Sequence, residues 1–480
     1  MTSGRLFVPV LALWLAACAT AEPQAPPPAL PPDTDTALVP EPVFRGSVYL
    51  LQAGLQNTRT VVLVHGLGER GLEDWDYLIP ELAKQYHVIA FDLPGFGRSS
   101  KANTLYSPAR YAQFIGWVID SYARQRVSLV GHSMGGGAAL YFAGRYPGRL
   151  ERLILLDVAG VLQRTVLLRH FAELRPTWPG SQLLRPVTAG LNAAARALLG
   201  ALDMESTPED IQELLQSPRQ RRQYLDGDPS RIAGLALIAT DFTPLLPRID
   251  TPTLILWGGD DRIAPLRTGK ALAFALDQAR LEVIPGIGHV PMQEAPHDTN
   301  GLILEALARP PQKPARRSAA ARERVGRCLG RNRVTFKGYY QFISIRGCKR
   351  VRLVDVDTRA VRIDGSHVLI RNSVIDGNRL ALTVLGSHLH MEDTVIRAED
   401  VAVNSVASQL SFTGARLQAR TALQLTGSKI DFAGVTLAGK LEAVRGTGES
   451  QARFSISRLI GAGGEEHLHG LRTLSYDQPL

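Results

Sequence analysis

Short apolar runs alternate with amphipathic stretches from about residue 47 to residue 310. The runs are rich in Val, Ile and Leu and are bounded by Gly, Pro or Asp, as in RTVVLVHG, YHVIAFDLPG, RVSLVGHS, LERLILLDVAG, TPTLILWGGDD and ARLEVIPGIGH. Runs that are apolar on both faces and separated by helices are typical of a mostly parallel, doubly wound α/β sheet. Ligand sites in such sheets lie beyond the carboxyl ends of the strands. We therefore expect the functional residues at these strand ends.

The pattern changes between residues 160 and 250. The stretches RTVLLRHFAELR, QLLRPVTAGLNAAARALLGALD and PEDIQELLQ are helical in periodicity and are interrupted by Pro and Gly. We expect a helical cap over the strand ends, within a domain that spans residues 43–310. The Leu/Ala-rich segment 191–202 suits an apolar acyl pocket, although the inner face of a cap is apolar whatever it covers.

A second period, of about 21 residues, follows a basic linker over residues 311–327. Apolar residues stand two and four positions after a serine, as Val368 and Ile370 do after Ser366. The units begin at Ser366, Ser387, Ser408, Ser428 and Ser450. Alternation with a period of two inside a longer fixed period is typical of a stacked solenoid. We expect this domain over residues 328–465, with residues 466–480 as a C-terminal tail.

The N-terminal residues have the pattern of an export signal. An apolar run ends in Leu15-Ala16-Ala17-Cys18, a tetrapeptide that resembles the lipobox of bacterial lipoproteins. The resemblance implies removal of residues 1–17, a lipid on Cys18 that anchors the chain in a membrane and, because Ala19 follows, the outer membrane of the cell envelope. An ordinary cleaved signal with an incidental cysteine is the alternative. Residues 18–42 hold eight prolines and predict an extended tether.

Positive charge is concentrated in the C-terminal part of the chain. Residues 1–310 carry 28 Lys+Arg against 30 Asp+Glu, whereas residues 311–480 carry 26 against 15. Thirteen of these basic residues lie within 311–352, where Glu323 is the single acid. The segment 313–352 could therefore bind an anionic lipid, lipopolysaccharide or an acidic glycan, and the export signal argues against nucleic acid. A solvated structural spacer is the alternative.

A serine stands at a crowded turn in Gly131-His132-Ser133-Met134-Gly135, which directly follows an apolar run. The pattern Gly-x-Ser-x-Gly between a strand and a helix lifts a serine hydroxyl clear of the sheet, and its neighbours must be small. Residues 47–310 resemble an α/β-hydrolase with a cap, because further motifs of that family follow in the family's order. These are HGLG at residues 65–68, DLPGFGRS at residues 92–99, ILWGGDDRIAP and IPGIGHVPMQEAP.

The resemblance implies a catalytic triad of Ser133, Asp261 and His289. Ser133 would attack an acyl carbon, His289 would carry its proton to the leaving group, and Asp261 would orient the imidazole. The backbone N–H groups of Leu67 and Met134 would form the oxyanion hole.

Two other acids remain open as the third member of the triad. Asp260 is adjacent and Asp157 ends another strand-like run, whereas Asp261 fits the family spacing Asp-Arg-Ile-x-Pro. We expect His65 and His132 to pack the loops, and Trp75 and Trp257 to lie in the core or in the walls of a pocket.

A serine nucleophile predicts hydrolysis of a carboxylic ester, with a lipid or an acylated glycan as the acyl-ester substrate. Acyl transfer to an alcohol would use the same residues, and a non-enzymatic envelope scaffold with a relic hydrolase domain is the competing class. The sequence has no phosphate loop, dinucleotide fingerprint or clustered metal ligands. We therefore expect neither a cofactor nor a metal.

The 21-residue units resemble the rungs of a right-handed parallel β-helix of the pectate-lyase type. Catalysis there would need grouped acids or bases; Asp355 and Asp357 are spaced to point the same way, and His367 and His388 should stack one rung apart. Later rungs replace that histidine with Gln409, Lys429 and Gln451. A ladder of solvated residues explains this series equally well, so the repeat predicts architecture more than activity.

Cys328 and Cys348 stand at the start of this repeat domain. In an exported protein they can form a disulfide, and two free thiols are the alternative.

Overall fold

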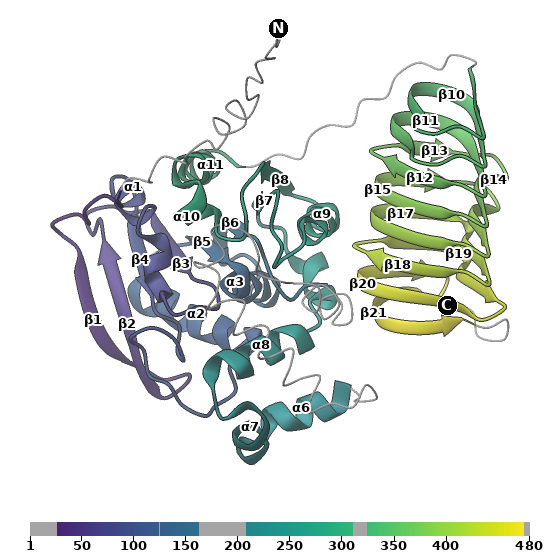
Figure 1. Cartoon of the computed structure of the whole chain (residues 1–480). Coiled ribbons are helices and arrows are strands. Elements are labelled where there is room, and N and C mark those ends of the chain that lie inside the picture. The colour runs from purple at the N-terminus through teal and green to yellow at the C-terminus, as the bar shows by residue number, and fades with distance from the viewer. Residues whose placement is uncertain (1–25, 124, 163–207, 311–323, 475–480) are drawn as a thin grey trace, which may run out of the picture.

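The computed structural model describes residues 26–123, 125–162, 208–310 and 324–474. Figure 1 shows an α/β domain beside a stack of strands. The expected signal peptide with Cys18, the segment 191–202 and most of the linker 311–327 lie outside the described residues.

The α/β domain is built on a sheet of eight strands in the order β1-β2-β4-β3-β5-β6-β7-β8. The six strands from β4 to β8 in this order pair in parallel. Strand β2 pairs antiparallel with both of its neighbours, β1 and β4. The strands are β1 (Asp35–Glu41), β2 (Gly46–Ala53), β3 (Thr60–Val64), β4 (His87–Phe91), β5 (Val127–His132), β6 (Leu150–Leu156), β7 (Thr253–Gly258) and β8 (Ala279–Ile284).

Helices cover both faces of this sheet, which confirms the doubly wound α/β arrangement. One buried cluster joins the sheet to Ile115, Phe142 and Leu272, and another joins it to Leu82 and Ile303. The first face carries α2 (Pro108–Tyr122), α3 (Ser133–Arg145) and α9 (Leu266–Ala275), and the second carries η2 (Gly71–Trp75), α1 (Ile79–Ala83), α10 (Pro291–Glu294) and α11 (Pro296–Ala308).

The described part of the expected cap consists of short helices that pack onto the first face through residues such as Leu237 and Leu245. They are α6 (Pro208–Gln216), α7 (Pro218–Leu225), α8 (Pro229–Ala239) and η3 (Thr243–Arg248).

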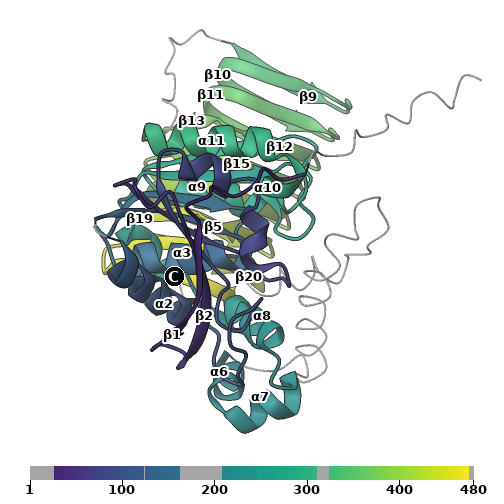
Figure 2. The same ribbon diagram turned by 90° about the vertical axis from the view of Figure 1, so that its left-hand side faces the viewer.

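The expected start of the α/β domain at residue 43 was wrong. Residues 35–41, which we assigned to the proline-rich tether, form β1 and pair antiparallel with β2 from Asp35↔Gln52 to Glu41↔Gly46. The Glu41 carboxylate fixes the intervening turn, since it accepts the N–H groups of Val43, Phe44 and Gly46. Pro40 is tolerated because β1 is an edge strand. Figures 1 and 2 show β1 and β2 on the side away from the strand stack.

The C-terminal domain is a stack of strands in which each rung pairs in parallel with the next. His367 pairs with His388, His388 with Gln409, Gln409 with Lys429 and Lys429 with Gln451, which confirms the repeat of about 21 residues. The strands are β9 (Val325–Leu329), β10 (Thr335–Arg346), β11 (Val351–Asp364), β12 (His367–Arg371), β13 (Val374–Asp376), β14 (Leu380–Leu385), β15 (His388–Arg397), β16 (Val401–Val406), β17 (Gln409–Thr426), β18 (Lys429–Ala433), β19 (Thr436–Thr447), β20 (Ser450–Gly461) and β21 (Gly464–Leu474).

Alternate residues of each rung point into a closed apolar core, as the period-two pattern predicts. Ile370, Met391 and Phe412 are fully buried in it. The repeated serines join successive turns: the Ser387 hydroxyl accepts the N–H of Ser366, and the Ser408 hydroxyl accepts the N–H of Ser387. The right-handed β-helix class of this coiled parallel sheet remains a prediction.

The expected C-terminal tail over residues 466–480 was wrong for its described part. Residues 464–474 form β21, which folds back and pairs antiparallel with β20. This strand covers the edge of the last rung with Leu468 and Leu474, both buried. Stacked sheets expose backbone donors and acceptors at their ends, and a returning strand satisfies them.

At the opposite end of the domain, Cys328 and Cys348 form a disulfide.

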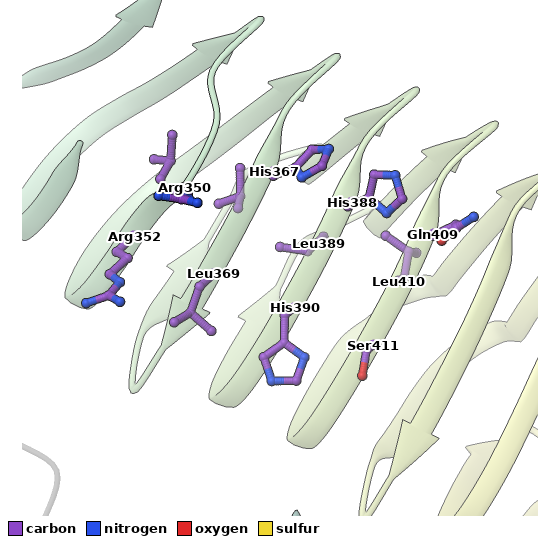
Figure 3. Close-up of a pocket in the computed structure, with 12 residues that line it drawn as sticks. Arg350, Arg352, His367, Leu369, His388, Leu389, His390, Gln409, Leu410 and Ser411 are labelled. Atoms are coloured by element: carbon purple, nitrogen blue, oxygen red, sulfur yellow. The ribbon is translucent and has the colours of Figure 1, made fainter. Parts of the chain in front are cut away.

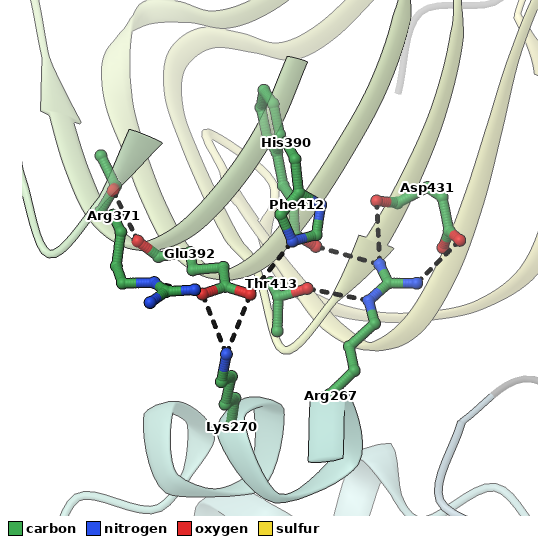
Figure 4. A network of polar contacts seen from close by, with 9 residues as sticks. Arg267, Lys270, Arg371, His390, Glu392, Phe412, Thr413 and Asp431 are labelled. Atoms are coloured by element: carbon green, nitrogen blue, oxygen red, sulfur yellow. Dashed lines mark hydrogen bonds and ion pairs between the residues drawn. The ribbon is translucent and has the colours of Figure 1, made fainter. Parts of the chain in front are cut away.

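Helix α9 joins the two domains through charged contacts (Figure 4). Arg267 donates to Thr413 Oγ1 at 2.8 Å and to Asp431 Oδ2 at 2.9 Å, and Lys270 Nζ lies 2.9 Å from Glu392 Oε2. Burial alone would raise the pKa of Glu392, but hydrogen bonds from His390 and Lys270, with the charges of Lys270 and Arg371, hold that pKa well below its usual range.

The backbones also approach closely at this interface. A Cβ on Gly434 would lie 2.6 Å from the carbonyl oxygen of Ala271, and Ala433 is buried in the core of the α/β domain. The strand stack is therefore packed against α9, which follows the strand β7 that leads to Asp261.

Candidate active site

Ser133 stands at the turn between β5 and α3. Its φ is +50°, a left-handed conformation that is strained for a residue other than glycine. Glycines make this turn possible, because a Cβ on Gly131 would lie 2.6 Å from the carbonyl oxygen of Gly135, and one on Gly135 would lie 2.2 Å from that of His65. The turn therefore requires glycine at the second position on each side of the serine.

Three side chains from different strand ends form one hydrogen-bonded chain. Ser133 Oγ lies 2.9 Å from His289 Nε2, and His289 Nδ1 lies 2.8 Å from Asp261 Oδ2. All three residues are buried. A carboxylate can only accept, so Nδ1 carries the proton and Nε2 is left as the acceptor for the serine hydroxyl. The structure thus brings together the residues that the sequence proposed for a triad.

Asp261 is held by the turn that follows β7. Its Oδ1 accepts the N–H groups of Ile263 and Ala264 at 2.7 and 3.0 Å, so only Oδ2 faces the imidazole. Asp260, the neighbouring alternative, is exposed, and within the described ranges its side chain forms no hydrogen bond or ion pair with His289.

Asp157, the other alternative acid, is buried directly behind Asp261. Its Oδ1 accepts the N–H of Gly258 at 2.9 Å. Burial, then the charge of Asp261, raises the pKa of Asp157 well above its usual range. Asp261 is therefore the acid that contacts the imidazole, whereas the raised pKa of Asp157 favours the uncharged form of that carboxyl.

This acid pair with His289 is also the one group in the described part of the chain that has the spacing of a metal site, since one ligand atom from each residue lies within 4.8 Å of the others. The Nδ1 atom that would face a cation already donates to Asp261. A protonated ring nitrogen cannot bind a metal, so the arrangement fits an acid–base relay better.

The two expected oxyanion donors lie at the ends of β5 and β3. Met134 is the second residue of α3, whose first N–H groups have no acceptor inside the helix. Leu67 is buried in the loop that follows β3. The helix N-terminus adds partial positive charge at the place where an oxyanion would form.

The neighbouring histidines hold the loops, as expected. His65 Nδ1 donates to the Gly66 carbonyl, which leaves Nε2 to accept the N–H of Leu93 at 2.8 Å. His132 Nε2 donates to the carbonyl of His289 at 2.8 Å and so fixes the backbone of that residue. Trp75 and Trp257 are fully buried in the core.

Sequence reasoning missed Asp74, which lies in η2 with its side chain only 13% exposed. Burial raises the pKa of Asp74 to about 7, against the opposing charges of Arg70 and His289. Arg70 Nε is 3.5 Å from its carboxylate. Nothing in the local pattern GLEDW distinguishes this acid from a solvated one, because its burial depends on the packing of distant segments.

We expect Asp74→Asn to stabilise the α/β domain at pH 8 by about 2 kcal/mol and to change little at pH 4. In the unfolded chain this carboxyl ionises near pH 4, whereas in the folded protein it holds its proton up to about pH 7. The folded state therefore loses stability as the pH rises through this window, and asparagine does not. The expected stabilisation is about half of the free energy that the whole difference in pKa between the two states implies, because solvent reaches part of the side chain and screens its charge.

Urea unfolding followed by tryptophan fluorescence would measure this, because all five tryptophans precede residue 310. Asp298→Asn on the surface of α11 is the control and should change stability little at either pH. A stabilisation by Asp74→Asn that is the same at pH 4 and pH 8 would contradict the raised pKa.

Comparisons with known proteins match the first of the two domains. The family model described as the alpha/beta hydrolase fold matches residues 59–296, a segment that ends before β9. A 2-hydroxy-6-oxo-2,4-heptadienoate hydrolase of Pseudomonas putida is 31% identical over 236 residues, which cover 48% of this chain and 82% of that protein. An uncharacterized protein of Mycobacterium tuberculosis is 30% identical over 251 residues, 49% of this chain and 71% of that protein. Among solved structures, an esterase from Thermogutta terrifontis is 27% identical with a TM-score of 0.41, covering 57% of this chain and 98% of that chain.

Proposed function

The chain belongs to the α/β-hydrolase family, and from this premise we propose that it is a serine hydrolase that cleaves a carboxylic ester of a lipid or an acylated glycan. The observation that carries the proposal is the continuous hydrogen-bonded chain from Ser133 Oγ through the His289 imidazole to Asp261. A strained serine beside a correctly protonated imidazole is the arrangement that activates a hydroxyl as a nucleophile.

In the proposed reaction, Ser133 Oγ attacks the acyl carbon while His289 Nε2 takes the hydroxyl proton. The N–H groups of Leu67 and Met134 would hold the negative charge on the former carbonyl oxygen. The intermediate collapses to an acyl-serine when His289 passes the proton to the departing alcohol. Water then attacks the acyl-serine, His289 accepts a proton from it, and the acid leaves as Ser133 is protonated again.

Acyl transfer is one alternative, because an alcohol in place of water could attack the acyl-serine in the second step of the same reaction. The other alternative is a non-enzymatic envelope scaffold whose hydrolase domain is a relic. The alternatives differ in outcome: a relic would not form an acyl-serine, whereas a transferase would form one and release it faster with an added alcohol.

We place this activity at the bacterial envelope, and the lipobox-like Leu15-Ala16-Ala17-Cys18 with the proline-rich segment behind it supports this proposal. A lipid on Cys18 would anchor the protein to the outer membrane. We also propose that the C-terminal domain is a right-handed parallel β-helix, which its parallel rungs of about 21 residues support. Within the described ranges, no helix has both the length and the apolar character needed to span a bilayer.

A fluorophosphonate probe tests the proposed nucleophile. We expect the full chain to be labelled on Ser133, with labelling lost in Ser133→Ala and in His289→Ala. Mass spectrometry of the labelled peptide identifies the site, and circular dichroism checks that each variant is folded. Folded wild-type protein that the probe does not label would overturn the proposal and favour the scaffold.

A further inference from the structure

A groove runs across the rungs of the C-terminal domain, outside the part that the family model matches (Figure 3). It has a volume of about 540 Å³, and its outward-facing side chains come from β11, β12, β15, β17 and the turn before β11. The residues that line it with polar groups are Arg350, Arg352, His367, His388, His390, Gln409 and Ser411. None of the lining residues is an acid.

These side chains form two rows along the stack. In one row, His367, His388 and Gln409 pair in register, and Arg350 continues it, because Arg350 and His367 immediately precede the paired Val351 and Val368. Neighbouring rungs are ~4.8 Å apart, and the rings of His367 and His388 lie 4.5 Å from each other. The row therefore offers one polar side chain at each rung.

The second row is Arg352, Leu369, His390 and Ser411, which also pair in register. His390 Nε2 lies 3.1 Å from Glu392 Oε1 on its own strand β15, and this glutamate also binds Lys270 of the α/β domain. Leu369 lies between the arginine and the histidine and gives this row an apolar patch.

Positive charge gathers at one end of the groove. An adjoining hollow of about 410 Å³ is lined by Arg333, Thr335, Arg350 and Arg352, so it shares two arginines with the groove. Arg333 and Arg350 both have left-handed φ values, of 60° and 56°, in successive turns. Within the described ranges none of these three arginines has an acid within ion-pair distance, whereas Arg346, Arg371 and Arg379 of the same domain are paired.

We propose that this groove binds a phosphorylated glycan, with a phosphate group at Arg333, Arg350 and Arg352 and the sugar units along the row from His367 to Gln409. Guanidinium groups match the oxygens of a phosphate in pairs, and several together suit its double charge. Imidazole and amide groups donate to and accept from sugar hydroxyls, and Leu369 offers a surface for the apolar face of a ring.

The distribution of charge favours phosphate over a chain of carboxylates. A polymer with one carboxylate on each sugar would need cations along the whole groove. Here the arginines are confined to the first rungs, and neutral or aromatic polar groups continue beyond them. The groove therefore suits a ligand with one phosphate group at the arginine end and a chain of sugar hydroxyls along the remaining rungs.

Isothermal titration of the full chain with a phosphomannan oligosaccharide tests the proposal, beside the same oligosaccharide after phosphatase treatment. We expect binding that weakens by about tenfold or more on dephosphorylation and by a similar factor in the double variant Arg350→Gln/Arg352→Gln. The single variant His388→Ala should weaken binding of the oligosaccharide while leaving that of inorganic phosphate unchanged.

The matched control is Arg359→Gln/Arg362→Gln, which removes the same charge from exposed positions elsewhere on the same rung, where Arg362 pairs with Thr383 of β14. This control should bind within twofold of the wild type. An equal loss of affinity in both double variants would mean that binding depends on the net charge of the domain and not on this groove, and would overturn the proposal. Equal binding of an oligogalacturonate would overturn the preference for phosphate, and so would unchanged binding after phosphatase treatment. None of these readouts uses the hydrolase activity.

Discussion

Ser133→Ala should lower kcat for ester hydrolysis by about 10⁴-fold to 10⁶-fold. Alanine removes the only atom that can attack the acyl carbon, and a water molecule in its place would lack the 2.9 Å contact with His289 Nε2 that activates the hydroxyl. The oxyanion donors and substrate binding would remain, so the residual rate should still exceed that in water. Hydrolysis of p-nitrophenyl esters of increasing chain length measures the loss and also reports the acyl length that the pocket accepts.

Ser128→Ala is the matched control for this experiment. Ser128 lies on the same strand β5, is 2% exposed and makes no contact with His289 that the structure records. We expect its kcat to stay within a few-fold of the wild type. A similar collapse of activity in Ser128→Ala would mean that the loss in Ser133→Ala reflects damage to β5 and not removal of the nucleophile.

The geometry of the proposed nucleophile and its partners could be predicted from the sequence because much of it is encoded locally. Only glycine fits where the Cβ of Gly131 or Gly135 would meet backbone, so the motif carries its own structural reason. Parallel strands place their carboxyl ends at one edge of the sheet. Residues that follow separate strands in the sequence, Ser133, Asp261 and His289, therefore converge.

The repeat domain was predictable for the same reason, since burial in each rung depends on an alternation that is visible in the sequence. Its boundaries were not. β21 lacks the serine that marks the other rungs and pairs antiparallel, so its partner is set by a chain reversal that the period does not contain. β1 was missed because it lies in the proline-rich segment 18–42, which suggested a tether, while its pairing with β2 depends on a turn held by Glu41.

Features that depend on packing between distant segments left no sequence signal. Asp74 owes its raised pKa to burial in η2, and the contacts of Arg267 and Lys270 join residues more than 120 positions apart. An arginine that ends in an ion pair and one that lines an open groove look alike in a sequence. The basic segment 313–352 could therefore be recognised, but the arrangement of Arg333, Arg350 and Arg352 around one end of a groove could not.

The two buried acids behind His289 give the second large prediction, because they should respond very differently to the same change. We expect Asp261→Asn to lower kcat by about 10³-fold to 10⁴-fold. The amide of asparagine can turn its N–H₂ toward Nδ1, which would favour the tautomer that has a proton on Nε2 and cannot accept from Ser133. An amide also lacks the charge that stabilises the imidazolium formed in the transition state.

Asp157→Asn should lower kcat by less than about tenfold. Burial and the charge of Asp261 raise the pKa of Asp157 and so favour its uncharged form, and asparagine is uncharged and has nearly the same shape. The amide oxygen can still accept the N–H of Gly258 that Asp157 Oδ1 accepts at 2.9 Å. Esterase assays on the two variants, with the folded state of each checked by circular dichroism, separate the roles. Equal losses in both variants would show that the acids act as one ionised unit, whereas a larger loss in Asp157→Asn would transfer the role of triad acid to the end of β6.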